Sequence, residues 1–521
     1  MVEKIARSMI DYLVIHAEES REKAAIICGD RELNYGALEN LSGRCRRVFK
    51  NLSLECGDRV ALIMCDCPEW VVAFLGVIGL GAIAVPCSTM VRATEIRSIL
   101  NDCGVRMAVV TSDQSGLVQA ALSEQLLPEL EVVLIAGGGT FELDGVKTLS
   151  FETALAEADA EPLADFEPRT PALILYTSGS SGTPKGVVHT HGDISYTIEK
   201  AGRGVYGITK EDRLFSSSRL FFAYGLGNSF SFPLGLGATS ILCRERPKPE
   251  LIAQVFAERR PTIFFGVPSV FRSLLEYRQE GHLLDTNSLR LCASAGETLP
   301  ARIFHEWRNE TGLEILDALG STELLHVFIA NQLDRVLPGS SGLPVMGYEV
   351  RLLDEAGQPV TGVGRGELQV KGASAFSGYW NQPEKTAETI SQDWVKTGDI
   401  YRRDEAGFYW HEGRSNDMFK AKGMWISPAE IEEVLCENDP VLEAAVVPEL
   451  DADGANVVAA YVVLRSDAVA DQQMIDLLKT AAGARLPRYK RPEQIYFLKE
   501  LPRTATGKVQ RFKLRERRDS Y

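Results

Sequence analysis

The sequence lacks the patterns that mark zinc-binding and nucleic-acid-binding proteins. Its 10 cysteines include no C-x-x-C pair and no Cys/His cluster with zinc-ligand spacing, and only Cys65 and Cys67 lie close together. A basic excess is missing as well, since 56 Lys and Arg face 71 Asp and Glu, for a formal net charge of −15. A nucleic-acid partner needs a basic face and is therefore not expected. Any anionic substrate must be drawn by a local positive site.

Signals for secretion or membrane insertion are also absent. Residues 1–19 carry acids and bases throughout, so no signal peptide is predicted, and scattered cysteines are typical of the reducing cytoplasm. One uncharged stretch runs from Trp70 to Pro86, but glycines interrupt it, and it is shorter than the ~20 residues that a bilayer requires. We expect this stretch to form a buried helix, a glycine turn and the short strand Ala82–Val85, with no membrane contact.

The pattern of apolar residues predicts a chain of several units, because 521 residues exceed one ordinary core. Helix-like and strand-like stretches alternate from about residue 20 to 165 and again from 239 to 311, which predicts two α/β units with parallel sheets. Beyond about residue 335, short alternating strands predict a small antiparallel sheet or barrel. The polar stretch Gly413–Asp417 is the best linker candidate, and the last hundred residues are typical of an α+β unit.

A segment rich in glycine and hydroxyl residues follows the apolar run Leu173–Tyr176. It reads Thr-Ser-Gly-Ser-Ser-Gly-Thr-Pro-Lys from residue 177 to 185. Glycines let backbone N–H groups converge on one point, hydroxyls add donors, and Lys185 adds the positive charge that a polyphosphate needs. The pattern is not G-x-x-x-x-G-K-[ST], which would require Gly at Pro184 and Ser or Thr at Gly186. Taken alone, it also fits a flexible turn between a strand and a helix.

Four later motifs extend this segment into a pattern that resembles the adenylate-forming superfamily, which contains acyl-CoA and aryl-CoA ligases, nonribosomal adenylation domains and beetle luciferases. In chain order they are Asp317–Glu323, Trp394–Asp399, Gly413–Gly423 and the segment from Pro502 to Lys508. Within the superfamily, the stretch Leu220–Asn228 and His326 are most similar to benzoate–CoA ligases. The resemblance implies an α/β fold: an N-terminal domain (1–413) of two doubly wound subdomains and a small β-barrel-like subdomain. A hinge (414–420) and a small mobile α+β domain (421–521) follow.

The resemblance also implies roles for the nucleotide-binding residues. Thr322 would contact the α-phosphate, Glu323 would hold Mg²⁺, and Lys508 would bridge the carboxylate and the α-phosphate. Asp317 would meet the adenine amino group, Asp399 the ribose hydroxyls, and Arg414 the ribose or a phosphate. By themselves, a Thr-Glu pair is a common helix start and Thr-Gly-Asp an ordinary turn. The full ATP- or AMP-binding set is Thr177, Ser178, Gly179, Ser180, Ser181, Gly182, Thr183, Lys185, Ala295, Gly296, Glu297, Asp317, Asp399 and Arg414.

The hinge and the CoA site are expected in the C-terminal part of the chain. Asn416 stands at the hinge position, where the family usually has Asp and sometimes Lys, but Asn still tolerates unusual backbone angles. Lys420 resembles the lysine that reaches the site in the second conformation, and Gly423 the glycine beside which pantetheine enters. Tyr489 and Arg491 resemble positions that meet the CoA nucleotide, although a solvated basic turn fits them as well.

An aromatic acid is the expected substrate, because Phe222 stands where amino-acid-activating relatives usually place Asp. Small neighbours would leave a flat slot that suits a planar ring. His326 fits either this slot or the core as a hydrogen-bonded histidine. The predicted acyl-binding residues are Phe222, Ala223, Tyr224, Gly225, Leu319, Gly320, His326 and Ile329.

The sequence therefore predicts an ATP-, Mg²⁺- and CoA-dependent ligase that converts a benzoate-type carboxylate to its CoA thioester through an aroyl adenylate. Lys508, Thr322, Glu323 and Lys420 are its predicted catalytic residues. Two alternatives stay open: an adenylating enzyme that loads a carrier protein, and an inactive relative that only binds nucleotide or a partner. A homodimer is compatible with the pattern, and neither the oligomeric state nor the ring substituent follows from the sequence.

Overall fold

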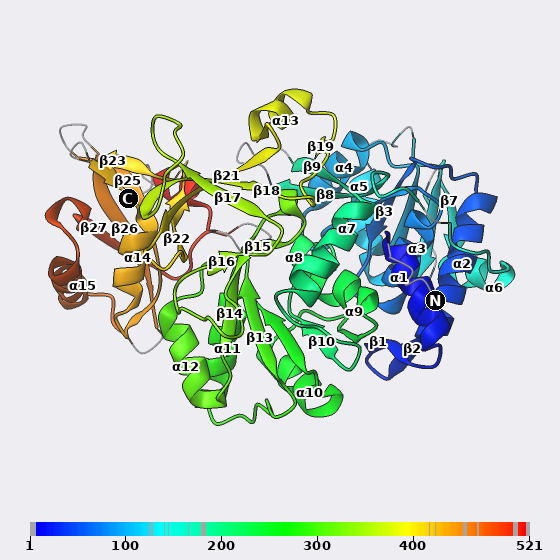
Figure 1. The fold of residues 1–521 in the computed structure, drawn as a ribbon, viewed down its shortest axis with the longest axis horizontal. Helices are drawn as coiled ribbons and strands as arrows, with labels where there is room; N and C mark the ends of the chain where they lie inside the picture. Colours follow the sequence, from blue (N-terminus) through cyan, green and yellow to red (C-terminus); the bar gives the residue numbers. More distant parts are fainter. Residues whose placement is uncertain are drawn as a thin grey trace.

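The computed structural model describes residues 7–123, 127, 129–139, 141–143, 145–164, 166–178, 184–415, 417–421, 424–451, 456–465, 468–503 and 509–516. Along the longest axis, the N-terminal α/β part lies at the right of Figure 1, a second α/β part at the centre, and the C-terminal strands and helices at the left. The strands β17 (Glu349–Leu353), β18 (Gly364–Lys371) and β21 (Trp394–Arg403) lie above the second part in this view, between the C-terminal part and the N-terminal part. The described chain is thus a row of sheet-based units.

The first large sheet has eight strands in the order β19-β9-β8-β4-β3-β5-β6-β7. Its centre is parallel, whereas β8, β9 and β19 pair antiparallel at one edge. Both faces are buried, because Val60 and Leu62 of β3 enter one apolar cluster and Ala61 and Ile63 enter another. The strands are β3 (Arg59–Ile63), β4 (Ile83–Pro86), β5 (Met107–Thr111), β6 (Val132–Ala136), β7 (Lys147–Ser150), β8 (Pro171–Ser178), β9 (Pro184–Thr190) and β19 (Gly378–Tyr379).

The second large sheet has nine strands in the order β16-β15-β14-β13-β12-β10-β11-β1-β2. Its central strands are parallel, and β14, β15 and β16 form an antiparallel edge. The strands are β1 (Ala24–Cys28), β2 (Arg31–Asn34), β10 (Arg213–Ser216), β11 (Thr239–Leu242), β12 (Ile263–Gly266), β13 (Leu291–Ala295), β14 (Ile315–Gly320), β15 (Val327–Ala330) and β16 (Leu343–Pro344).

Helices connect the parallel strands and cover the sheets. Around the first sheet these include α2 (Tyr35–Asn51), α3 (Pro68–Ile78), α4 (Ala93–Asp102), α5 (Ser115–Leu122) and α6 (Phe151–Glu157). The others before the smaller sheets are α1 (Met9–Glu19), α7 (His191–Thr197), α8 (Ala223–Leu226), α9 (Phe232–Gly235), α10 (Pro249–Arg259), α11 (Pro268–Gln279) and α12 (Ala301–Thr311). Two π-helical segments, Ile198–Arg203 and Gly227–Ser231 (η3), lie between α7 and α9.

Three smaller sheets complete the described structure. The five-stranded sheet runs β17-β18-β21-β20, and β22 pairs with β21. The two-stranded β23-β24 sheet and the three-stranded β25-β26-β27 sheet follow with their helices. Their elements are β17 (Glu349–Leu353), β18 (Gly364–Lys371), α13 (Pro383–Thr389), β20 (Ile390–Ser391), β21 (Trp394–Arg403), β22 (Tyr409–Arg414), β23 (Phe419–Ala421), β24 (Met424–Ile426), α14 (Pro428–Cys436), β25 (Val441–Leu450), β26 (Asn456–Leu464), α15 (Gln472–Arg485), β27 (Gln494–Leu498) and α16 (Arg511–Glu516).

The predicted fold class is confirmed, including the buried helix and short strand between Trp70 and Pro86. Two local features differ from what the sequence pattern suggested. The glycine-rich segment is followed by strand β9 rather than by a helix, because Pro184–Thr190 pairs antiparallel with β8. The linker candidate Gly413–Asp417 begins inside a strand, since Gly413 and Arg414 pair with Ile400 and Asp399 of β21.

No helix within the described ranges is long and apolar enough to cross a membrane.

Candidate active site

The predicted phosphate-binding segment joins two strands of the first sheet. Thr177 is the second-to-last residue of β8 and faces Lys185 of β9 across the antiparallel ladder. The Lys185 ammonium lies 5.1 Å from the centre of the Tyr379 ring. Of the other predicted residues, Gly179, Ser180, Ser181, Gly182 and Thr183 lie outside the described part of the chain. The structure therefore fixes the two ends of the segment on neighbouring strands.

Thr322 and Glu323 follow β14 in the short 3-10 turn η4 (Thr322–Leu324). The Glu323 carboxylate accepts a hydrogen bond of 2.9 Å from the Tyr379 hydroxyl. The Thr322 carbonyl lies 2.7 Å from Nε2 of His189, whose Nδ1 lies 2.8 Å from the Asp193 carboxylate. The Glu323–Tyr379 and Thr322–His189 contacts join the edge of the second sheet to strands β19 and β9 of the first. The predicted phosphate and metal residues are thus brought to the junction of the two sheets.

One carboxylate at this position suits a magnesium ion that is bound together with phosphates. It does not suit a metal ion whose ligands all come from the protein. Among the described residues, no group of three or more His, Cys, Asp and Glu side chains is arranged to hold a metal ion. Mg²⁺ is usually bound by one or two carboxylates together with substrate phosphates. Glu323, next to Thr322 and across from Lys185, meets that requirement.

Asp317 lies on β14 and is almost completely buried, with 3% of its surface exposed. Its Oδ2 is 3.4 Å from the Leu299 N–H group, and its Oδ1 has no hydrogen-bond partner among the described residues. Burial raises the pKa of this carboxyl from 3.8 to about 8, although the Leu299 backbone lowers it. Near it, Gly296 takes φ +94°, a left-handed conformation, and Ala295 ends β13. A buried polar atom without a partner is the feature expected where a ligand supplies one.

Asp399 and Arg414 are the second pair of predicted nucleotide-binding residues. They face each other on β21 and β22, and the Arg414 Nε lies 2.9 Å from Asp399 Oδ1. Arg414 also donates a 3.1 Å hydrogen bond to the Thr397 carbonyl. His411 Nε2 lies 3.6 Å from the same carboxylate oxygen. These contacts hold the carboxylate between β21 and the neighbouring strand β22 of the five-stranded sheet.

Aromatic side chains gather around His326, as predicted for the acyl slot. The His326 ring centre is 5.4 Å from that of Tyr224 and 4.5 Å from that of Phe232. Neither His326 nitrogen has a partner at a short hydrogen-bond distance within the described part of the chain. Burial lowers the pKa of His326 to about 3, and the Tyr224 backbone offsets this only in part. The imidazole is therefore neutral. A Cβ on Gly227 would lie 2.3 Å from its Cδ2, so glycine is needed there.

The remaining predicted acyl residues lie on two neighbouring segments. Ala223 and Gly225 belong to α8, which begins directly after Phe222. Leu319 of β14 pairs with Ile329 of β15, and Gly320 ends β14. A Cβ on Gly320 would lie 2.7 Å from the His326 carbonyl oxygen. The strand that carries Asp317 thus also carries predicted acyl-binding residues.

The C-terminal residues are only partly described. Lys508, Asn416 and Gly423 lie outside the described residues. Lys420 is exposed on β23. Arg503 Nη1 lies 3.7 Å from Glu297, so the segment that leads toward Lys508 lies beside the predicted adenine site.

The two predicted CoA-binding residues lie near the end of α15. Tyr489 packs against the C-terminal apolar cluster, and Arg491 donates a 2.9 Å hydrogen bond to the Leu486 carbonyl. The described structure does not bring either of them to the nucleotide residues.

Sequence reasoning missed three side chains that the structure adds. Tyr379 contacts both Glu323 and Lys185, and His189 contacts the Thr322 backbone. Asn228 is fully buried next to the acyl residues, and neither end of its amide has a partner. A Gly-Tyr pair and a single histidine carry no motif signal. Asn228 ends the benzoate-ligase-like stretch, and His189 lies four residues after Lys185, at the end of the glycine-rich stretch.

Comparison with known proteins agrees with this arrangement. Residues 13–380 match the AMP-binding enzyme family, and residues 430–508 match the AMP-binding enzyme C-terminal domain. The chain belongs to the AMP-binding enzyme family. It is 40% identical to a benzoate–CoA ligase of Thauera aromatica, covering 92% of this chain and 90% of that one. It is 36% identical to a 4-hydroxybenzoate–CoA/benzoate–CoA ligase of Rhodopseudomonas palustris, covering 97% and 93%.

Solved structures give the same result. An anthranilate CoA ligase in complex with anthranoyl-AMP matches with a TM-score of 0.91 at 34% identity, covering 98% of this chain and 96% of that chain. A benzoate CoA ligase from Burkholderia xenovorans matches with a TM-score of 0.87 at 36% identity, covering 98% and 99%. The predicted relationship to adenylate-forming enzymes and benzoate–CoA ligases is confirmed.

Proposed function

We propose that this protein is an AMP-forming aryl-CoA ligase that activates a benzoate-type carboxylate with ATP and transfers the aroyl group to CoA. One observation supports this proposal: buried polar atoms that lack a partner among the described residues lie at both the predicted adenine position and the predicted acyl position. They belong to Asp317 on one side and to Tyr224, Asn228 and His326 on the other. Buried polar groups are normally paired, so a bound nucleotide and a ring-bearing acid would supply the missing partners.

In the first step, the carboxylate would attack the α-phosphorus of ATP and release pyrophosphate. The segment that ends at Lys185 would hold the phosphates that leave, and Thr322 would orient the α-phosphate. Asp399 and Arg414, ion-paired at 2.9 Å, would hold the ribose. Lys508 would stabilise the charge that develops in the transition state. Most of the catalysis would come from positioning and electrostatics, as is usual for transfers at phosphorus.

Glu323 would hold Mg²⁺ beside the phosphates. Bound there together with ATP, Mg²⁺ would supply positive charge that offsets part of the charge of the phosphates. The Tyr379 hydroxyl donates to one carboxylate oxygen of Glu323 and would fix the orientation of that side chain.

In the second step, residues 421–521 would rotate about the hinge 414–420, with Asn416 at its pivot. This movement would withdraw Lys508 and bring Lys420 and Gly423 to the site. The thiol of CoA would then attack the aroyl adenylate and release AMP, with Tyr489 and Arg491 near the CoA nucleotide. A cytoplasmic location fits the cysteines, which are all free thiols. A homodimer stays a prediction of the sequence.

The test is a substrate panel with two readouts. Pyrophosphate exchange and CoA-thioester formation would be measured with benzoate, its hydroxy and amino derivatives, and phenylacetate. The expected result is exchange and thioester formation with at least one benzoate. Exchange without any CoA thioester would instead support loading of a carrier protein, and no exchange with any acid would support a binding-only relative.

A further inference from the structure

Tyr379 stands between two charged groups of opposite sign. Its hydroxyl donates a 2.9 Å hydrogen bond to Glu323, and its ring lies under the Lys185 ammonium at 5.1 Å. No ion pair joins Lys185 to Glu323, and both side chains belong to the described part of the chain. A direct pair would neutralise the cation that phosphates need and occupy the carboxylate that a metal needs. The tyrosine contacts both groups and keeps each available.

The backbone around Tyr379 is fixed from several sides. It pairs with Val187 on β9, and its own N–H donates a 2.9 Å hydrogen bond to Thr386 Oγ1. The next residue, Trp380, donates from its backbone N–H to the Gly186 carbonyl at 2.7 Å. Tyr379 itself is 7% exposed. Its position is therefore set by the same strand that carries Lys185.

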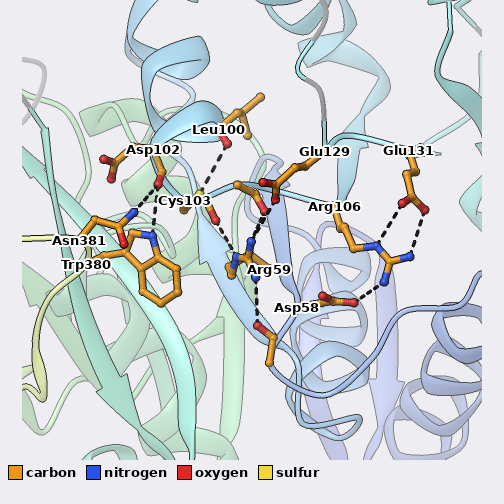
Figure 2. Close-up of polar contacts among 12 residues, drawn as sticks. Asp58, Arg59, Leu100, Asp102, Cys103, Arg106, Glu129, Glu131, Trp380 and Asn381 are labelled. Atoms are coloured by element: carbon orange, nitrogen blue, oxygen red, sulfur yellow. Dashed lines mark hydrogen bonds and ion pairs between the residues drawn. The ribbon is translucent and has the colours of Figure 1, made fainter.

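A second anchor holds the turn after Tyr379. Figure 2 shows Trp380 Nε1 and Asn381 Nδ2 directed at one acceptor, the Asp102 carbonyl at the end of α4, at 3.2 and 3.1 Å. The Asp102 carboxylate accepts a 2.5 Å hydrogen bond from Tyr176, the residue before Thr177. One helix end thus ties together the strand that leads into the phosphate segment and the turn that follows Tyr379.

The helix end is in turn held by the first sheet. Arg59, the first residue of β3, donates hydrogen bonds of 2.6 Å to the carbonyls of Cys103 and Gly104 (Figure 2). Its guanidinium also lies 5.6 Å from the centre of the Trp380 ring. These contacts therefore link β3 of the first sheet, through the end of α4, to the turn that follows Tyr379.

We propose that Tyr379 is a positioning residue that orients the Glu323 carboxylate for a divalent cation and holds the Lys185 ammonium apart from it for the phosphates of ATP. The proposal rests on the proposed function, because it assigns both groups to the adenylation step. Partners that orient metal-binding side chains commonly change metal affinity or activity by about 10–100-fold when they are removed. A cation over an aromatic face adds a separate contribution from the ring.

Two substitutions separate these contributions. Tyr379→Phe keeps the ring and removes the hydroxyl, so the free Mg²⁺ concentration for half-maximal ATP binding should rise by about tenfold or more. Tyr379→Leu also removes the ring, so the Kd of ATP at saturating Mg²⁺ should rise as well. Calorimetric titration of ATP at several Mg²⁺ concentrations measures both effects without turnover. Thioester formation from supplied aroyl adenylate should be unchanged in both variants.

Tyr196→Phe is the matched control. Tyr196 also donates its hydroxyl to a single acceptor, the Gly347 carbonyl, and also lies under a lysine, Lys200, at 5.6 Å. This variant should leave the Mg²⁺ requirement unchanged. Wild-type Mg²⁺ dependence in Tyr379→Phe would overturn the proposal, as would equal loss of both half-reactions or the same effect in Tyr196→Phe. If the wild-type enzyme forms no thioester, the proposed function fails, whereas the ATP titration still decides the role of Tyr379.

Discussion

Replacing the buried carboxyl of Asp317 by an amide should change how the stability of the protein depends on pH. Burial raises the pKa of Asp317 from 3.8 to about 8 in the folded protein. Between these values the folded state holds a proton that the unfolded state has lost. Stability therefore falls as pH rises through this window, by about 1.4 kcal/mol per pH unit for one proton. Asn cannot ionise, so the stability of the Asp317→Asn variant does not fall in this way as the pH rises.

The expected size follows from the same slope. From pH 5 to pH 7, the unfolding free energy of Asp317→Asn should rise relative to wild type by about 3 kcal/mol. Above about pH 8 the difference should level off, because both states of the wild-type carboxyl are then ionised. Chemical denaturation of both proteins at intervals from pH 5 to pH 9 measures this difference. A difference that stays constant across that range would refute the buried, proton-holding carboxyl.

Asp66→Asn provides the control, since burial raises the pKa of Asp66 only to about 6, with Arg219 opposing the rise. The difference in unfolding free energy between Asp66→Asn and wild type should change below about pH 6 and stay constant above it. Adding AMP should reduce the pH dependence of the wild type, if the adenine amino group donates to Asp317. Asp317→Asn should show no such response to AMP.

Three further predictions concern single side chains. Lys508→Ala should abolish pyrophosphate exchange but leave thioester formation from supplied aroyl adenylate, and equal loss of both would contradict the two-conformation mechanism. Arg414→Ala should raise the KM for ATP by about tenfold, because Asp399 loses a charge-assisted partner, and an unchanged KM would exclude a nucleotide role. Gly227→Ala places a Cβ 2.3 Å from Cδ2 of His326, so it should lower stability by about 1–3 kcal/mol and weaken aromatic-acid binding. If Gly227→Ala has the Tm and the aromatic-acid affinity of the wild type, the close contact between position 227 and His326 is not as tight as the structure indicates.

The sequence predicted the sheets better than the contacts between them. Alternating apolar runs were enough for the two parallel sheets, because buried parallel strands carry a strong continuous pattern. Strand β9 was missed, since Pro184 and Gly186 are poor strand residues and only pairing with β8 makes the segment extended. Asp399 and Arg414 were found through their motifs, but the 2.9 Å ion pair between them depends on the register of β21 and β22.

Tyr379 is a residue that sequence patterns could not have identified, for a different reason. A Gly-Tyr pair at the end of a polar stretch has no periodicity and no distinctive neighbours, so nothing local distinguishes it from an ordinary turn. Its proposed role comes from its contacts with Glu323 of the turn η4 and Lys185 of strand β9. Contacts of this kind are set by tertiary packing. They become visible only when the edge strands of both large sheets are placed together.

The ion pairs of the C-terminal part have a distribution that suits the proposed rotation. Across the proposed boundary, Arg302 pairs with Asp439 at 3.2 Å, and the Asp439 side chain is 92% exposed. Exposed pairs of this kind contribute only about 0–1 kcal/mol each, so exchanging them costs little. Arg511 of the C-terminal part instead binds both Glu432 of the same part and Asp417 of the hinge, at 2.8 and 3.2 Å, with 21% of its own side chain exposed. Because Asp417 directly follows Asn416, these tighter contacts would keep residues beyond the hinge moving as one body.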